Sequence, residues 1–332
     1  MSRWSVRKRL SQLLMPVAWD SSAAVTKLVA RNEVGAIFVG GNVTDMFTSG
    51  VLRDLRTSSG IPVAVAIDEE GGRVQRIDEL DGSMPSARRL GAKSPEEVLA
   101  IATTRAERMR SYGVTVDLGP VLDVEDRRSK ASIGDRAFSS DVEVITSHAG
   151  AFAEGLRRGG ITPTFKHFPG NGRAVGDSHF GKVVTPALDD LRAVDLVPYR
   201  ELLDDGPAWV MVGHFEVPGL TDGDLASVSP AAITGLLRTE LGFDGVVMAD
   251  ELGNMRDVNT RYGLKEAAIR FLAAGGDVVH WNTPQTVDEV LGWLEGAVAT
   301  GRITEARLDE SVMRVLRSKQ YDPCAAPDQM NG

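Results

Sequence analysis

The chain has 332 residues but a single cysteine, Cys324, and no apolar stretch long enough to cross a bilayer. A single cysteine excludes a disulfide within the chain. Because no histidine lies near Cys324 in the sequence, we interpret it as an incidental thiol of the C-terminal tail and not as a catalytic nucleophile. The missing apolar stretch predicts that no segment spans a membrane.

Basic residues are outnumbered as well: 37 Lys and Arg face 46 Asp and Glu, for a net charge of -9. This balance argues against nucleic acid or an anionic membrane as the main partner. Four basic residues between Arg3 and Arg9 precede the apolar run 13–18 and faintly resemble an export signal. The run is short, contains Pro16 and lacks a convincing cleavage site, so a lead-in helix and a first strand are favoured. We expect a cytoplasmic monomer, with an exported, trimmed form as the alternative.

Two common catalytic patterns are missing. The absence of Gly-x-Ser-x-Gly disfavours a serine hydrolase of that type. No two of the five histidines have the spacing His-x-His or His-x-x-x-His, which disfavours a zinc centre. We expect neither a metal nor a cofactor.

What the sequence does contain is a series of short apolar runs, each followed by a longer segment with helical periodicity. The runs are too uniformly apolar for half-exposed strands, so both of their faces should be covered, as in a parallel sheet. We predict eight strands, at Leu13–Val17, Gly35–Val39, Val63–Ile67, Val114–Leu118, Ile161–Phe165, Trp209–Val212, Gly245–Ala249 and Asp277–His280.

The segments between the strands carry helix signals. Ser94-Pro95-Glu96-Glu97 combines an N-cap, a proline at the first helical position and a capping-box acid, and predicts a helix to about Ser111. Further helices are predicted at 140–158, from Ser229-Pro230 to about 241, at 287–300 and at 304–319.

This alternation predicts one domain over residues 1–332, a single (β/α)8 barrel ordered at about 10–320 and followed by a tail. An open doubly wound sheet is the rival, but no glycine-rich phosphate turn follows the first strand. Charged or ring side chains follow nearly every strand, and in a barrel these strand ends meet on one face, where barrel enzymes place their sites. They are Asp68, Glu70, Asp123, Lys166, His167, His214, Asp250 and His280.

Two of these regions suggest catalysis. Asp250 ends an apolar strand, where a carboxylate is costly to desolvate unless it is paired or used, and Glu251 beside it should point elsewhere. Asp177 and His179 lie on the glycine-rich stretch after the fifth strand, where the carboxylate could hold one imidazole nitrogen and leave the other for proton transfer. An exposed histidine with a chance neighbour is the alternative.

The stretch 68–76 contains acids and arginines that could bind hydroxyl groups of a polar ligand. A surface loop with local salt bridges explains it equally well. Asp135 beside Arg136 is likewise as well explained by a structural pair as by a ligand site.

Five motifs occur in order along the chain: Asp68-x-Glu70-Gly71-Gly72-Arg73-Val74-x-Arg76, Pro120-Val121-Leu122-Asp123-Val124, Gly134-Asp135-Arg136-x-Phe138, Lys166-His167-Phe168-Pro169-Gly170-x-Gly172 and Asp177-Ser178-His179. Together they resemble the bacterial β-N-acetylglucosaminidases of glycoside hydrolase family 3, of the NagZ type, over about residues 10–320. The resemblance implies a cofactor-free barrel that removes terminal β-linked N-acetylglucosamine from peptidoglycan fragments with retention of configuration.

By this resemblance Asp250 matches the nucleophile, and His179 matches the acid/base, supported by Asp177. The chain departs from the family pattern in three places: Asn171 replaces a histidine, Ala249 replaces a serine or threonine, and the segment Gly253-Asn254-Met255 differs from the usual sequence after the nucleophile. None of these departures removes the catalytic pair, so an active enzyme is expected. The residues that match sugar-binding positions are Asp68, Arg76, Arg136, Lys166 and His167.

Two alternatives stay open. A relative of this type could use phosphate in place of water and act as a phosphorylase, because a neutral imidazole does not repel an incoming anion. The same barrel mouth could also belong to a catalytically weak sugar-binding protein.

Overall fold

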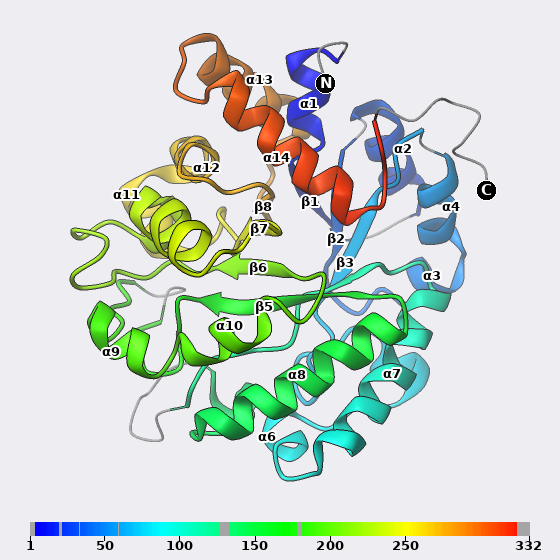
Figure 1. Cartoon of the computed structure of the whole chain (residues 1–332). Coiled ribbons are helices and arrows are strands. Elements are labelled where there is room, and N and C mark those ends of the chain that lie inside the picture. The colour runs from blue at the N-terminus through cyan, green and yellow to red at the C-terminus, as the bar shows by residue number, and fades with distance from the viewer. Residues whose placement is uncertain are drawn as a thin grey trace.

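A computed structural model describes residues 4–19, 22–32, 34–58, 60–125, 133–177 and 181–323. Its centre is a ring of eight parallel strands surrounded by helices (Figure 1). The strands are β1 Leu14–Ala18, β2 Ala36–Val39, β3 Ala64–Ile67, β4 Val116–Asp117, β5 Thr162–Phe168, β6 Trp209–Val212, β7 Val246–Ala249 and β8 Val279–Trp281.

The predicted barrel is confirmed by the order of its strands. Hydrogen-bonded neighbours run β7-β6-β5-β4-β3-β2-β1-β8, so sequential strands pair throughout. A parallel bridge between Met248 and Val278 brings β7 against β8 and nearly closes the ring. There the Ala249 N–H donates to the Val278 carbonyl oxygen over 3.1 Å.

Helices cover the outer face of the strands. They are α1 Val6–Ser11, α2 Ser22–Asn32, α3 Thr44–Thr48, α4 Val51–Ser58, α5 Asp78–Asp81, α6 Ala87–Leu90, α7 Pro95–Ser111, α8 Val142–Arg158, α9 Leu188–Ala193, α10 Val197–Leu202, α11 Arg256–Arg261, α12 Gly263–Ala273, α13 Val287–Ala299 and α14 Glu305–Ser318. Three further helical segments are the 3-10 turns η1 Gly134–Arg136 and η2 Ala226–Val228 and the π-helix η3 Ala231–Glu240.

The helix signals are well reproduced. Ser94 caps α7 by accepting from the Glu97 N–H, and the Glu97 side chain accepts from the Ser94 N–H. The long helices α7 and α8 pack closely at Gly155, where a Cβ would lie only 2.6 Å from the Ala102 Cβ. The segment after Ser229 is helical as expected, but it winds as a π-helix.

Two strands differ from their predicted limits at polar residues. β5 continues to Phe168, beyond the predicted end at Phe165, because Lys166 and His167 are buried and paired although their side chains are polar. β8 begins at Val279 and not at Asp277, whose carboxylate instead binds arginines outside the sheet.

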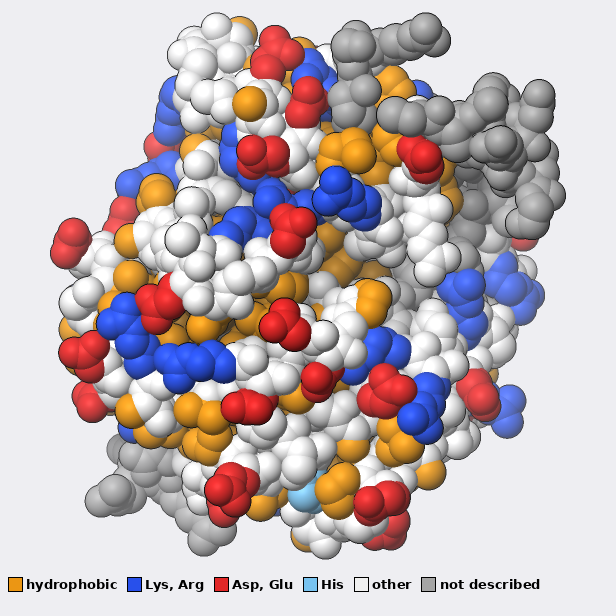
Figure 2. All heavy atoms as spheres, in the orientation of Figure 1, with side chains coloured by type: hydrophobic (Ala, Val, Ile, Leu, Met, Phe, Trp, Pro, Cys, Tyr) orange, Lys and Arg blue, Asp and Glu red, His pale blue; other side chains and the backbone are white. Residues whose placement is uncertain are grey.

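The two end segments of the described chain lie together, as Figure 1 shows for α1, α13 and α14. Arg9 on α1 reaches Glu305 and Asp309 on α14, each at 2.8 Å. Acidic and basic side chains are interspersed over the face seen in Figure 2. Among the described residues, no helix is both long and apolar enough for a membrane span.

Candidate active site

A cavity of about 270 Å³ opens at the carboxyl ends of the strands, and we call it the mouth cavity. Its volume is near the lower end of the roughly 300–1,000 Å³ of small-molecule sites, which suits a single sugar ring. Six of the eight predicted site residues line it. They are Asp68, Arg76, Arg136, Lys166, His167 and Asp250.

The two remaining predicted residues come from the loop after β5. Asp177 is half-buried, and its carbonyl oxygen accepts from the Gly181 N–H over 3.0 Å. His179 lies outside the described residues, so its role stays a prediction.

On one side of the mouth cavity, four charged side chains form what we call the charged cluster: Asp68, Glu70, Arg136 and Lys166. The Lys166 ammonium lies 2.8 Å from Asp68 Oδ1 and 2.5 Å from Glu70 Oε1. Arg136 donates two hydrogen bonds of 2.7 Å to the Glu70 carboxylate, from Nε and from Nη2. Each buried charge therefore has an opposite charge in contact, as burial requires.

Electrostatics keep this cluster ionised. Burial alone would raise the pKa of Glu70, but Arg136 and Lys166 outweigh it and hold that pKa below its ordinary value. Burial likewise disfavours the Lys166 ammonium, yet Asp68 and Glu70 raise the pKa of Lys166 above its ordinary value. The cluster thus presents fixed donors and acceptors to a ligand in the mouth cavity.

His167 is oriented by a buried carboxylate. Its Nδ1 lies 2.7 Å from Asp123 Oδ2, and Arg136 Nη2 lies 3.4 Å from its Nε2. Because a carboxylate only accepts and a guanidinium only donates, the proton belongs on Nδ1 and Nε2 is the acceptor. Asp123, which follows β4, thereby acts on the site through His167.

The structure corrects the interpretation of the Asp135-Arg136 pair. These neighbours do not bind each other through their side chains: Arg136 binds Glu70, while Asp135 forms a 2.9 Å contact with Arg73 in which both side chains are about half exposed. Arg136 belongs to the site, and Asp135 belongs to a surface salt bridge. The stretch 68–76 likewise contributes Asp68 and Arg76 to the mouth cavity and is more than a surface loop.

Asp250 lies directly after β7, with its N–H donating to the Val212 carbonyl oxygen over 3.0 Å. Its Oδ1 accepts from the Glu251 N–H over 2.8 Å. Burial raises the pKa of Asp250, but charge interactions with His167, His214 and Lys166 together with the hydrogen bond from the Glu251 N–H outweigh it, so that the pKa falls below its ordinary value. Asp250 is therefore an anion at neutral pH.

Glu251 lines the mouth cavity beside Asp250, although it was predicted to point elsewhere, but its carboxylate is engaged by the backbone. Its carboxylate accepts from the backbone N–H groups of Gly253, Asn254 and Asn282 over 2.6 to 2.7 Å. It thus joins the loop after β7 to the loop after β8.

His214, which follows β6, is fully buried beneath Asp250. Its Nε2 lies 3.0 Å from the Glu251 carbonyl oxygen and its Nδ1 lies 2.8 Å from Ser227 Oγ. Since a carbonyl only accepts, Nε2 carries the proton. Burial lowers the pKa of His214, which favours this neutral form.

The loop that carries Asp177 has a fixed base. Val175 and Val184 exchange two backbone hydrogen bonds of 2.8 and 3.0 Å, and Val184 also pairs with Glu216 after β6. Lys182 adds a 2.5 Å ion pair to Glu216. The backbone is thus fixed at Val175 and at Val184, on either side of residues 178–180, and Val184 connects it to Glu216 after β6.

Sequence reasoning missed part of the mouth cavity. Trp19 and Asn282 line it next to the apolar side chains of Phe38, Met211 and Met255. Trp19 and Asn282 each come one residue after a strand, so the position rule that found the charged residues could have found them too. In the described part of the chain, no three His, Cys, Asp or Glu side chains are grouped to hold a metal ion.

A (β/α)8 barrel that places the buried carboxylate of Asp250 near fixed hydrogen-bond donors and acceptors has the arrangement expected of a glycoside hydrolase. A family model described as the glycosyl hydrolase family 3 N terminal domain matches residues 5–318. The chain therefore belongs to glycosyl hydrolase family 3.

Individual relatives agree. Beta-hexosaminidase LpqI of Mycobacterium tuberculosis is 44% identical over 327 residues, which cover 96% of this chain and 84% of the relative. A family 3 glycosyl hydrolase structure from Mycobacterium smegmatis has 46% identity and a TM-score of 0.91, covering 96% of this chain and 98% of that one. A family 3 beta-N-acetylglucosaminidase structure from Paenibacillus sp. has 29% identity and a TM-score of 0.88, covering 96% and 62%. The resemblance inferred from the five motifs is confirmed.

Proposed function

We propose that this protein is a retaining exo-β-N-acetylglucosaminidase that hydrolyses terminal β-linked N-acetylglucosamine from peptidoglycan fragments. The observation that carries the proposal is the ionised Asp250 in a one-sugar cavity beside the charged cluster. The names of the relatives support the sugar specificity, since they are called beta-hexosaminidases and beta-N-acetylglucosaminidases.

In the proposed first step, Asp250 attacks the anomeric carbon of the bound sugar. The Glu251 N–H donates to Oδ1 of Asp250, which fixes the orientation of the carboxylate for this attack. The bond from the anomeric carbon to the leaving oxygen breaks, and His179 gives that oxygen a proton. The product of this step is a sugar esterified to Asp250.

In the proposed second step, His179 accepts a proton from water as the water attacks the anomeric carbon. The ester bond breaks and returns the carboxylate of Asp250, so both groups end as they began. Asp177 would hold the second imidazole nitrogen through both steps. Meanwhile Asp68, Arg76, Arg136, Lys166 and His167 would hold the hydroxyl groups of the sugar.

The test is the release of N-acetylglucosamine from an aryl β-N-acetylglucosaminide by the wild type, by Asp250→Asn and by Asp135→Asn. Loss of a covalent nucleophile should lower kcat by about a thousandfold or more. Asp135→Asn is the same chemical change in an exposed salt bridge and should keep wild-type activity. Equal rates for the wild type and Asp250→Asn would overturn the proposal.

Adding phosphate to the same assay separates the hydrolase from the phosphorylase. A hydrolase gives free N-acetylglucosamine whether or not phosphate is present. Detection of the sugar 1-phosphate by mass would replace the hydrolase with the phosphorylase.

A further inference from the structure

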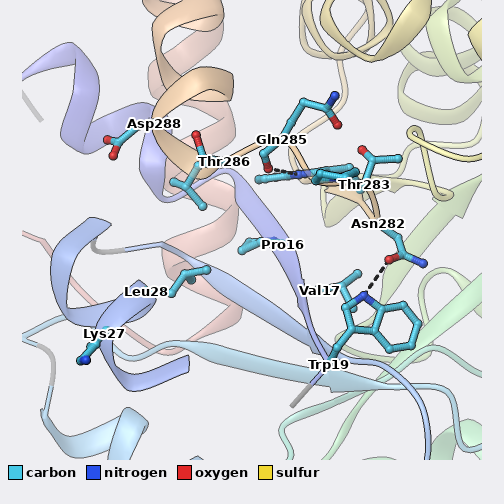
Figure 3. A pocket seen from close by; sticks show the side chains of 13 residues that line it. Pro16, Val17, Trp19, Lys27, Leu28, Asn282, Thr283, Gln285, Thr286 and Asp288 are labelled. Carbon is cyan, nitrogen blue, oxygen red and sulfur yellow. Dashed lines mark hydrogen bonds between the residues drawn. The ribbon is translucent and has the colours of Figure 1, made fainter. Parts of the chain in front are cut away.

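A second hollow, of about 760 Å³, lies beside the mouth cavity, and we call it the lateral groove. It lies between the ends of β1 and β8 and the helices α2 and α13 (Figure 3). Most of its wall is apolar, with Pro16, Leu28 and Pro284 beside the indole rings of Trp19 and Trp281. Thr283 and Gln285 add polar groups at its edge.

The groove and the mouth cavity share a wall. Val17, Trp19 and Asn282 line both hollows. Trp19 is 51% exposed, which is unusual for so large an apolar side chain and leaves ring surface uncovered between the two hollows. Its ring also rests on Gly40, where a Cβ would lie 2.9 Å from the indole.

Hydrogen bonds to the loop after β7, in which Asp250 lies, hold this wall in place. Glu251 Oε1 accepts from the Asn282 N–H over 2.7 Å, and the Asn282 carbonyl oxygen accepts from Asn254 Nδ2 over 2.5 Å. Asn282 Oδ1 in turn accepts from Trp19 Nε1 over 2.8 Å, and Figure 3 shows the two side chains pointing toward each other. The position of the indole is therefore set relative to the residue next to Asp250.

We propose that the lateral groove binds the leaving-group sugar of the substrate, with Trp19 as the surface on which that pyranose ring stacks. The proposal rests on the proposed function. The mouth cavity holds one sugar ring, so the ring on the far side of the scissile bond must lie outside it, and the groove is the adjoining hollow. A pyranose has an apolar C–H face that suits an indole, and its hydroxyl groups can reach the Asn282 amide nitrogen, which the bond to Trp19 leaves as a donor.

The experiment compares two substrates that carry the same terminal sugar. In N,N'-diacetylchitobiose the leaving group is a pyranose, whereas in N-acetylglucosaminyl β-fluoride it is one atom that cannot reach the groove. Because Trp19 also lines the mouth cavity, the ratio between the two substrates is the readout: Trp19→Ala should lower kcat/KM for the disaccharide about tenfold more than it lowers kcat/KM for the fluoride. Trp19→Phe keeps a ring and should recover most of the loss.

Trp293→Ala on α13 removes a tryptophan that lines neither hollow and should treat the two substrates alike. Equal losses on both substrates in Trp19→Ala, or an unchanged rate on the disaccharide, would overturn the assignment of the groove. A wild-type enzyme that releases N-acetylglucosamine from neither substrate would instead overturn the proposed function. Thermal unfolding of each variant checks that the protein remains folded after the substitution at Trp19 or Trp293.

Discussion

Three consecutive acids after β3 have different environments. Asp68 and Glu70 belong to the charged cluster. Glu69 lies between them in sequence, but its side chain is fully buried and does not contact Lys166. Glu69 Oε2 accepts from the Arg76 N–H over 2.7 Å, and its Oε1 lies 3.6 Å from Arg105. Burial outweighs these contacts and raises the pKa of Glu69 to about 7. The alternation of side chains along an extended chain explains the division.

This raised pKa predicts a pH-dependent stability. Between the ordinary pKa of 4.5 and about 7, folded Glu69 keeps its proton while the unfolded chain releases it, so rising pH costs stability in this window. Glu69→Gln removes that cost and can still accept the backbone hydrogen bond. Its free energy of unfolding relative to wild type should rise by up to about 3 kcal/mol between about pH 5 and pH 8. Denaturant unfolding at both pH values measures the difference.

The exposed Glu79 offers the control, because Glu79→Gln is the same change without burial. Its stability relative to wild type should not vary over the same pH range. A Glu69→Gln difference that is also constant with pH would show that Glu69 is ionised in the folded protein.

Residue by residue, position after a strand was the most informative signal. It predicted that Asp68, Lys166 and Asp250 lie together at the mouth of the barrel, where the structure places them, because barrel topology alone brings strand ends together. It could not assign partners: Arg136 lies next to Asp135 in sequence but binds Glu70, which is 66 residues away. Trp19 was missed because a large apolar side chain after an apolar strand is typical of core.

At the scale of elements, the base of the loop with Asp177 depends on one glycine. Gly176 has φ of 113°, and a Cβ there would lie 2.3 Å from the Lys182 carbonyl oxygen. Gly176→Ala should therefore displace the adjacent Asp177 and cost about 1–3 kcal/mol of local strain. We expect at least a tenfold loss of kcat, measured on the aryl substrate, with a melting temperature lowered by only a few degrees.

Gly181 lies in the same loop, and a Cβ there would meet no atom within 4 Å. Gly181→Ala should therefore keep most of the activity. Equal effects of the two alanines would mean that the base of the loop does not position Asp177.

The ends of the predicted helices were more accurate than the ends of β4, β5 and β8, although helices such as α2, α9 and α12 were not predicted. Capping residues such as Ser94 and Thr286 act locally, so the sequence around them is sufficient to place a helix end. A strand end depends on partners that are distant in the chain. β5 was predicted too short because the partners of Lys166 lie on the loop after β3, which no local pattern reveals.

At the scale of the whole molecule, Asp277 joins several elements at the face of the barrel opposite the mouth. Its buried carboxylate lies 2.6 Å from Arg238 on η3 and 2.6 Å from Arg307 on α14. It also accepts from Ser311 Oγ and from the Val247 N–H. Residues at this face of a barrel serve stability and not chemistry.

Asp277→Ala should leave the buried Arg238 without its acidic partner and Arg307 with only the exposed Glu310 among the described acidic residues, and it should lower the free energy of unfolding by about 3–5 kcal/mol. The activity per folded molecule should stay at the wild-type level. Asp244→Ala is the control, since Asp244 is 70% exposed in its ion pair with Arg314. Its removal should lower the free energy of unfolding by less than about 1 kcal/mol. A comparable loss of stability in both variants would contradict the structural role of the buried Asp277 carboxylate.

The wall formed by Trp19 and Asn282 divides the mouth of the barrel into two compartments, and this division has a consequence for timing. In the proposed reaction the leaving group departs in the first step, so the lateral groove is vacated before water attacks the ester on Asp250. The leaving group would then affect only the rate at which the ester on Asp250 forms. The breakdown rate of the ester would be the same for every substrate that donates the same terminal sugar.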